Sequence, residues 1–293
     1  MNWIEKTYIQ TIDFSRLKTY SEVNSYSKIT KDVVVHYQPT TGHFQGTNIW
    51  YIVAKHKKLA PQSQTWKLID AIKQHQTIDC AIIEVPTLIW NLSYPEHAGI
   101  KPFDVMCKDL KNHDFYWENI HAYYTFTGLD LPIHARPHTT VINGEDDAQE
   151  SIKSLLTEGH MSALDIITYL CYDKTQHEMP LQTTLKRIRA HYGPAHYGPY
   201  LPIDFNTITE NMITSNPHWG SWVAEHDTVM AVRDKHMLKK LFAAAKQYKN
   251  IVVVYGYAHW STQKDVLEQS FGAPISIKNY EKYIRSSTTF NRE

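Results

Sequence analysis

Four short apolar runs, each set between helical or polar segments, constrain the fold of this chain more than any other feature. They are Asn48–Ala54, Asp79–Val85, Thr139–Asn143 and Ile251–Tyr255. Their β-branched and aromatic residues are typical of strands, and each run is far shorter than the roughly 20 residues of a membrane-spanning helix. Because helical patterns alternate with the runs, the sequence predicts an α/β fold. Its central sheet should be mostly parallel or mixed, with helices on both faces.

The segments around these runs predict the remaining elements. Asp32–Tyr37 is a fifth strand candidate that can pair with Asn48–Ala54 as a hairpin. We expect helices over residues 61–76, 114–127, 226–248 and 261–272. A further helical stretch over 146–173 is interrupted at Gly159, and Ser162 is placed to cap the helix that follows.

No linker or long repeat marks a domain boundary, so residues 1–293 are predicted to form a single domain. Residues 1–30 form an irregular or helical lead-in. Residues 146–225 form a helical and loop-rich insertion, of which 174–225 should be the least regular part.

The charge balance limits the classes of partner. The chain has 30 Lys and Arg against 30 Asp and Glu, which argues against general binding to nucleic acid or an acidic membrane. We expect no membrane span, and no secretory signal is visible at the N-terminus. Three cysteines without a Cys-x-x-Cys spacing argue against a disulfide scaffold, so a cytoplasmic location is expected.

The candidate site follows from the positions of four polar residues. Nucleotide-binding and serine-hydrolase glycine motifs are absent from the sequence. In open α/β sheets, ligands bind beyond the carboxyl ends of the strands. Each of the four runs has a suitable residue at or near that end: His56, Glu84, Glu145 and His259. Two imidazoles and a carboxylate are a set that binds zinc, manganese or iron and leaves positions open for water and substrate.

Each of these residues also has a structural explanation. His56 lies among lysines and suits a solvated turn, Glu84 within an apolar run suits a buried salt bridge, and Glu145 suits a carboxylate at a helix N-terminus. For His259, Gly256 allows a tight turn after the strand that projects the imidazole at the sheet edge. Arg233 lies in an apolar helical segment, where it either pairs with an acid or stabilises a bound carboxylate or oxyanion.

The order of these motifs resembles the TraB/PrgY-like family, whose relatives include the Tiki metalloproteases and the erythromycin-esterase and ChaN-like group. The family carries two Gly-x-x-His motifs, a glutamate ending the intervening strand and an arginine at a helix start. Gly256–His259 matches the second motif in full, whereas Val53 replaces the glycine of the first motif, which ends at His56. The resemblance covers about residues 45–90 and 228–275. It implies that His56, His259 and Glu84 hold a divalent metal and that the activity is on peptide bonds.

Two functions follow as hypotheses. The first is a metal-dependent hydrolase acting on an amide or ester bond of a peptide or small molecule. In it Glu84 is a ligand or base, Glu145 a second base candidate and Arg233 an oxyanion stabiliser. The alternative is a non-catalytic protein that sequesters a peptide or haem in the same place, with Tyr255, Tyr257 and Trp260 as lining candidates.

Overall fold

The strands form one sheet within the computed structural model, which describes residues 12–23, 33–54, 64–84, 117–129, 131–144, 154–176, 180–192, 203–204, 206–220 and 222–277. The strands are β1 (Val33–Tyr37), β2 (Asn48–Ala54), β3 (Cys80–Ile83), β4 (Thr140–Asn143), β5 (Asn250–Gly256) and β6 (Ile275–Ile277). Their order in the six-stranded sheet is β4-β3-β5-β2-β1-β6. The four runs recognised in the sequence are therefore all strands and lie side by side.

The sheet is mixed and mostly parallel, which confirms the predicted α/β class. Neighbouring strands are parallel from β4 through β3 and β5 to β2, whereas β1 is antiparallel to both β2 and β6. The expected hairpin is formed by β1 and β2, with Val33 opposite Val53. The sequence analysis missed β6, a three-residue strand that pairs only with β1; so short a run has no periodicity of its own.

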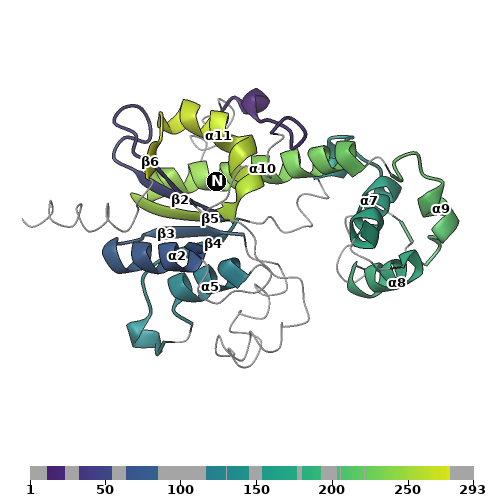
Figure 1. Cartoon of the computed structure of the whole chain (residues 1–293), viewed down its shortest axis with the longest axis horizontal. Coiled ribbons are helices and arrows are strands. Elements are labelled where there is room, and N and C mark those ends of the chain that lie inside the picture. The colour runs from purple at the N-terminus through teal and green to yellow at the C-terminus, as the bar shows by residue number, and fades with distance from the viewer. Residues whose placement is uncertain are drawn as a thin grey trace, which may run out of the picture. The chain divides into compact units, whose positions relative to one another are not determined.

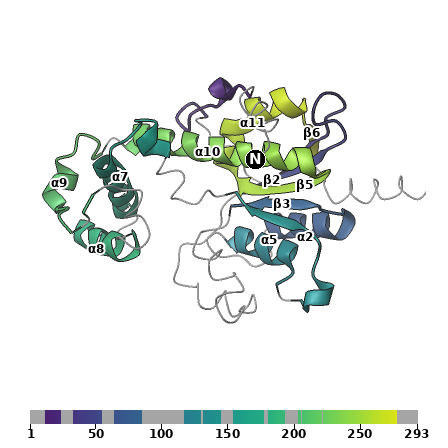
Figure 2. The same cartoon turned by 180° about the vertical axis from the view of Figure 1, so that it is seen from behind.

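Helices cover both faces of the sheet (Figure 1). They are α2 (Gln64–His75), α5 (Trp117–Thr127), α10 (Trp222–Gln247) and α11 (Tyr257–Phe271). Alternate residues of β5 divide between two hydrophobic clusters: Val252 and Val254 pack with α2 and α5, and Ile251 and Val253 pack with α11 and the last turns of α10. Figure 2 shows the two layers from behind. Burial on both faces explains why β2, β3 and β5 are nearly continuous apolar runs.

Residues 14–18 of the lead-in pack within the sheet unit. The short helix η1 (Phe14–Arg16) contacts α11, where the Lys18 amide donates to the Thr262 carbonyl at 3.2 Å and the Lys18 ammonium pairs with Asp265 at 2.9 Å. A second short helix, η2 (Ile133–Ala135), precedes β4. Gly128, predicted to end the helix before it, has a φ of +64° and donates its N–H to the Tyr124 carbonyl, as expected of a helix C-terminus.

The start of α11 differs from the prediction. The helix begins at Tyr257 rather than at residue 261, and Gly256 is its N-cap with φ −60° and ψ 150°. Gly256 has an extended conformation, so the change from strand to helix uses no positive φ at this glycine. His259 instead lies in the first turn of the helix, because the chain passes directly from strand to helix.

The chain divides into two compact units. The sheet unit comprises Met1–Lys18, Val23–Glu145 and Met237–Glu293, and the second unit comprises Thr19–Glu22 and Asp146–His236. The expected insertion of 146–225 falls within the second unit. The interpretation of the whole chain as one domain stays a prediction.

The second unit is helical, with α7 (Ala163–Gln176), α8 (Leu181–Tyr192) and α9 (Glu210–Thr214) around a separate hydrophobic cluster. The prediction of an irregular segment from residue 174 is wrong for α8. That helix buries Leu185 and Thr184, so packing against α7 stabilises a segment whose sequence is rich in polar residues.

Candidate functional site

The carboxyl ends of the four parallel strands share one edge of the sheet. Ala54, the last residue of β2, is the register partner of Gly256 at the end of β5, and Ile83 of β3 lies opposite Val254 and Asn143. Of the four predicted site residues, Glu84 and His259 are described, whereas His56 and Glu145 lie outside the described residues. The predicted site can therefore be compared with the structure at two of these four residues, Glu84 and His259.

Glu84 and His259 lie together at this edge, although they are far apart in the sequence. Glu84 directly follows β3, and the distance from its Oε1 to Nε2 of His259 is 3.3 Å. Their side chains are only 7% and 5% exposed. A buried carboxyl group needs a polar partner, and the contact with His259 meets the requirement that the sequence placed on Glu84.

Glu84 also caps the helix that carries His259. Its Oε2 accepts a hydrogen bond from the N–H of Gly256 at 3.4 Å, and Gly256 is the N-cap residue of α11. The carboxylate thus occupies the position that a glutamate within the helix takes in a capping box, next to the positive end of the helix dipole. No local pattern predicts this contact, because Glu84 follows a strand that is distant from α11 in the sequence.

His259 has two further neighbours. The imidazole meets the ring of Tyr255 edge to face, with centroids 5.2 Å apart and planes at 88°. The main-chain carbonyl of His259 accepts a hydrogen bond from the Thr262 hydroxyl at 2.8 Å. The imidazole is therefore bounded by Glu84 at Nε2 and by Tyr255 at the ring.

Gly144 directly follows β4 and lies close to the side chain of Tyr255, so a third strand end contributes to the surroundings of His259. A Cβ at Gly144 would lie 2.6 Å from Cε2 of Tyr255 and 2.8 Å from Cγ2 of Ile82. Both distances are shorter than real Cβ contacts, so only glycine fits beside the phenol here. The Gly144 N–H donates to the Ile83 carbonyl at 2.8 Å, which fixes the main chain immediately before Glu145.

The spacing of Glu84 and His259 fits two adjacent ligands of one metal ion. Zinc–nitrogen and zinc–oxygen bonds of about 2.0–2.2 Å place adjacent tetrahedral ligands about 3.3–3.5 Å apart. A charge-assisted hydrogen bond is shorter, at about 2.7–2.9 Å. The described residues contain no group of three or more His, Cys, Asp or Glu that could hold a metal ion. The described part of the site therefore offers two donors, and the predicted set needs His56 as its third.

Arg233 belongs to the second unit, in the part of α10 that precedes Met237. Its side chain is partly buried, and Nη1 donates to Sδ of Met230 at 3.4 Å. A role for Arg233 toward an oxyanion stays a prediction.

The aromatic residues considered for a binding site take part in packing. Tyr255 is 2% exposed within the cluster that faces α11. The indole N–H of Trp260 donates to the Tyr37 hydroxyl at 3.3 Å, and Tyr257 packs beside Trp260 with centroids 6.2 Å apart. These contacts favour a structural role for the aromatic residues at the start of α11.

Cys80 in β3 is a poor candidate for a nucleophile. Burial raises the pKa of its thiol to about 12, and the neighbouring charge of Asp79 acts in the same direction. Because the thiolate is the reactive form, this cysteine is inert at neutral pH.

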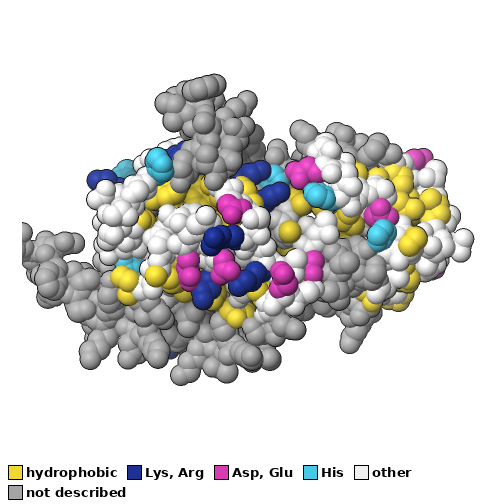
Figure 3. All heavy atoms as spheres, turned by 90° about the horizontal axis from the view of Figure 1, so that it is seen from above, with side chains coloured by type: hydrophobic (Ala, Val, Ile, Leu, Met, Phe, Trp, Pro, Cys, Tyr) yellow, Lys and Arg dark blue, Asp and Glu magenta, His cyan; other side chains and the backbone are white. Residues whose placement is uncertain are grey.

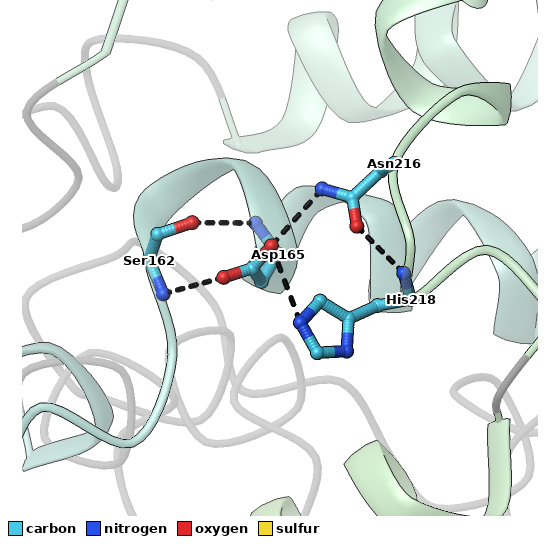
Figure 4. A network of polar contacts seen from close by, with 4 residues as sticks. All are labelled: Ser162, Asp165, Asn216 and His218. Atoms are coloured by element: carbon cyan, nitrogen blue, oxygen red, sulfur yellow. Dashed lines mark hydrogen bonds and ion pairs between the residues drawn. The ribbon is translucent and has the colours of Figure 1, made fainter.

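A second polar network, in the second unit, joins Ser162, Asp165, Asn216 and His218 (Figure 4). Ser162 and Asp165 exchange two hydrogen bonds of 2.9 and 3.2 Å, which confirms Ser162 as the N-cap of α7 in a capping box. Oδ1 of Asp165 also accepts from the Asn216 amide at 3.0 Å and lies 3.9 Å from Nε2 of His218. Partial burial acts to raise the pKa of Asp165, but the hydrogen bonds from Ser162 and Asn216 and the His218 charge outweigh it and hold that pKa below its ordinary value.

This network does not have the arrangement of a Ser-His-Asp triad. In a triad the imidazole lies between the serine and the carboxylate, whereas here the Asp165 carboxylate lies between Ser162 and His218 (Figure 4). The hydroxyl of Ser162 accepts the Asp165 N–H. The network therefore caps α7 and joins it to the turn after α9.

Surface charge shows no single-sign field on the face drawn in Figure 3, where the described basic and acidic side chains are interspersed. Among the described segments, no helix is both long and apolar enough to cross a bilayer. No family model, curated protein or solved structure matches the chain. The resemblance to the TraB/PrgY-like family therefore stays a prediction that depends on the residues themselves.

Proposed function

We propose that this protein is a metal-dependent hydrolase of amide or ester bonds, with its centre at the carboxyl edge of the sheet. The observation that carries the proposal is the buried pair of Glu84 and His259 at a separation suited to two ligands of one ion. A divalent cation bound there would activate water for attack and polarise the carbonyl of the substrate.

The contacts of Glu84 with Gly256 and His259 favour one of the two roles considered for it. Oε2 is held by the N–H of Gly256, which leaves Oε1 facing His259. Glu84 would thus bind an ion through a single oxygen and orient the helix that carries the second ligand. This favours Glu84 as a ligand rather than as the base that removes a proton from water.

The base and the third ligand are assigned from their neighbours in the chain. His56 follows Ala54 by two positions, and Ala54 is the register partner of Gly256. Glu145 follows Gly144, whose main chain is bound to the end of β3. We assign His56 as third ligand and Glu145 as base, because each is close in sequence to a strand end at this edge.

Metal analysis of the purified protein tests the proposal. The protein should contain close to one equivalent of manganese, zinc or iron, and His259→Ala and Glu84→Gln should each reduce the bound metal at least about tenfold. His134→Ala serves as the control, since His134 is an exposed histidine on η2. Chelator should abolish hydrolysis of activated esters or fluorogenic peptides, and added metal should restore it.

Other results would overturn the proposal. A preparation that contains no metal, binds none of the three added ions and is indifferent to chelator would exclude it. Haem titration distinguishes the alternative, because a shifted Soret band that disappears in His259→Ala would instead support a binding protein.

A further inference from the structure

We propose that Tyr255 is a positioning residue for His259, an assignment that rests on the proposed function for its chemical consequence. The ring of Tyr255 meets the imidazole edge to face at 5.2 Å. Aromatic contacts of this geometry favour one orientation of each ring over others. Tyr255 therefore holds the imidazole in the orientation in which Nε2 faces Glu84.

The orientation of His259 needs such a contact. An imidazole can rotate about its bond to Cβ and can carry its proton on either nitrogen. The contact between Glu84 Oε1 and Nε2 of His259 is 3.3 Å long, which is longer than an optimal charge-assisted hydrogen bond. The edge-to-face contact with the Tyr255 ring restricts rotation of the imidazole and so adds a constraint of a different kind.

Tyr255 is in turn fixed by the end of β4. Its side chain is 2% exposed, and it lies so close to Gly144 that a Cβ there would overlap its ring. Any side chain at position 144 would push the phenol away from its present place. The order of contact is thus β4, Tyr255, His259 and Glu84, which connects three strand ends to one imidazole.

Substitutions of Tyr255 separate positioning from simple packing. Tyr255→Phe keeps the ring and should leave metal affinity within about twofold of the wild type. Tyr255→Leu removes the ring and should weaken metal affinity about 10- to 100-fold, the range for residues that orient metal ligands. Phe271→Leu is the matched control, because Phe271 is a buried ring at the last residue of α11, whereas His259 lies in the first turn of that helix.

A second readout uses the metal-free protein. A long-range proton–nitrogen NMR spectrum reports which imidazole nitrogen carries the proton, and comparison with His259→Gln identifies the signals of His259. Wild type, Tyr255→Phe and Phe271→Leu should show one tautomer, whereas Tyr255→Leu should show a mixture. Gly144→Ala, which displaces the phenol without removing it, should behave as Tyr255→Leu and replaces that variant if it does not fold.

The outcomes separate this inference from the proposed function. Equal changes in Tyr255→Leu and Phe271→Leu, or none in Tyr255→Leu and Gly144→Ala, would overturn the positioning role. A wild type that binds no metal, together with a mixed tautomer in Tyr255→Leu, would exclude the proposed function and leave the positioning role standing.

Discussion

Two carboxylates flank the four-residue strand β3, and both contact β5, yet their surroundings differ. Asp79, before the strand, accepts hydrogen bonds at Oδ2 from the main-chain N–H groups of Lys249 and Asn250 and from the Asn250 amide. Glu84, after the strand, is more deeply buried and faces an imidazole. The amino edge of the sheet is thus closed by neutral donors, whereas the carboxyl edge holds two groups that can change charge or bind an ion.

This difference indicates which edge of the sheet can hold a metal site. Three N–H donors of the neighbouring strand converge on Oδ2 of Asp79, which gives this carboxylate a structural role. Oε1 of Glu84 faces the imidazole of His259, and such an oxygen atom can also bind a metal ion. Substitutions at the two positions should therefore have different consequences, and the following experiments test that difference.

The largest loss of stability is expected for Glu84→Ala. It removes the buried carboxylate partner of His259 and the acceptor of the Gly256 N–H, so we expect the free energy of unfolding to fall by about 3–5 kcal/mol. Urea denaturation measures this loss. A fall below about 1 kcal/mol would contradict a buried, structurally coupled pair.

A smaller loss is expected for Asp79→Ala. The Lys249 N–H at this edge is partly exposed and can turn to water, so the substitution should cost about 1–2 kcal/mol. Metal content should not change. If Asp79→Ala removed metal as fully as Glu84→Gln, the two edges would not differ in function.

The third test concerns His36, a buried histidine of β1 that stacks on Trp50. Burial lowers the pKa of His36 below its ordinary value of 6.5, and a hydrogen bond with Asn48 only partly opposes this effect. The unfolded chain therefore binds a proton more readily than the native protein. The stability associated with neutral His36 is complete above pH 6.5 and is lost as pH falls through the lowered pKa.

His36→Phe isolates this contribution. The variant should lose less stability than the wild type between about pH 7.5 and pH 5.5, by about 1 kcal/mol. Urea denaturation at the two pH values provides the measurement. Parallel losses in both proteins would show that His36 titrates equally in the folded and unfolded states.

The smallest effect on stability is expected for the double variant Glu84→Gln with His259→Gln. The amides keep an acceptor for the Gly256 N–H and can hydrogen-bond to each other, and replacing both members of a buried polar pair together is often close to neutral. We expect a change within about 1 kcal/mol, with metal binding lost. Retained metal would show that the ion binds elsewhere.

The fold was predictable to a large extent because β-branched runs and helical periodicity are local properties. The four parallel strands and the β1–β2 hairpin follow from the apolar runs, and the Ser162 cap follows from its position before α7. The errors have physical reasons as well. Hydrogen bonds to β1 stabilise β6, and a hydrophobic cluster that α8 shares with α7 stabilises α8. Neither contact is visible in the local sequence.

The candidate site was predictable only as a set of strand-end residues. The sequence indicated that Glu84 needs a partner and that His259 follows a buried strand. It did not indicate that Glu84 would cap α11, or that Tyr255 and Gly144 would bound the imidazole. These contacts join residues that are distant in the chain, and no local pattern encodes them.

Residue order alone identified strands β1 to β5, the polar residues that follow the parallel strands and the need of a buried acid for a partner. These follow from hydrophobicity, backbone preference and the cost of an isolated charge in an apolar environment. Tertiary structure alone decided that β5 lies between β2 and β3, and so brought His259 to Glu84. Several neighbours and registers are possible for each strand, and the packing of the whole sheet selects the one of lowest free energy.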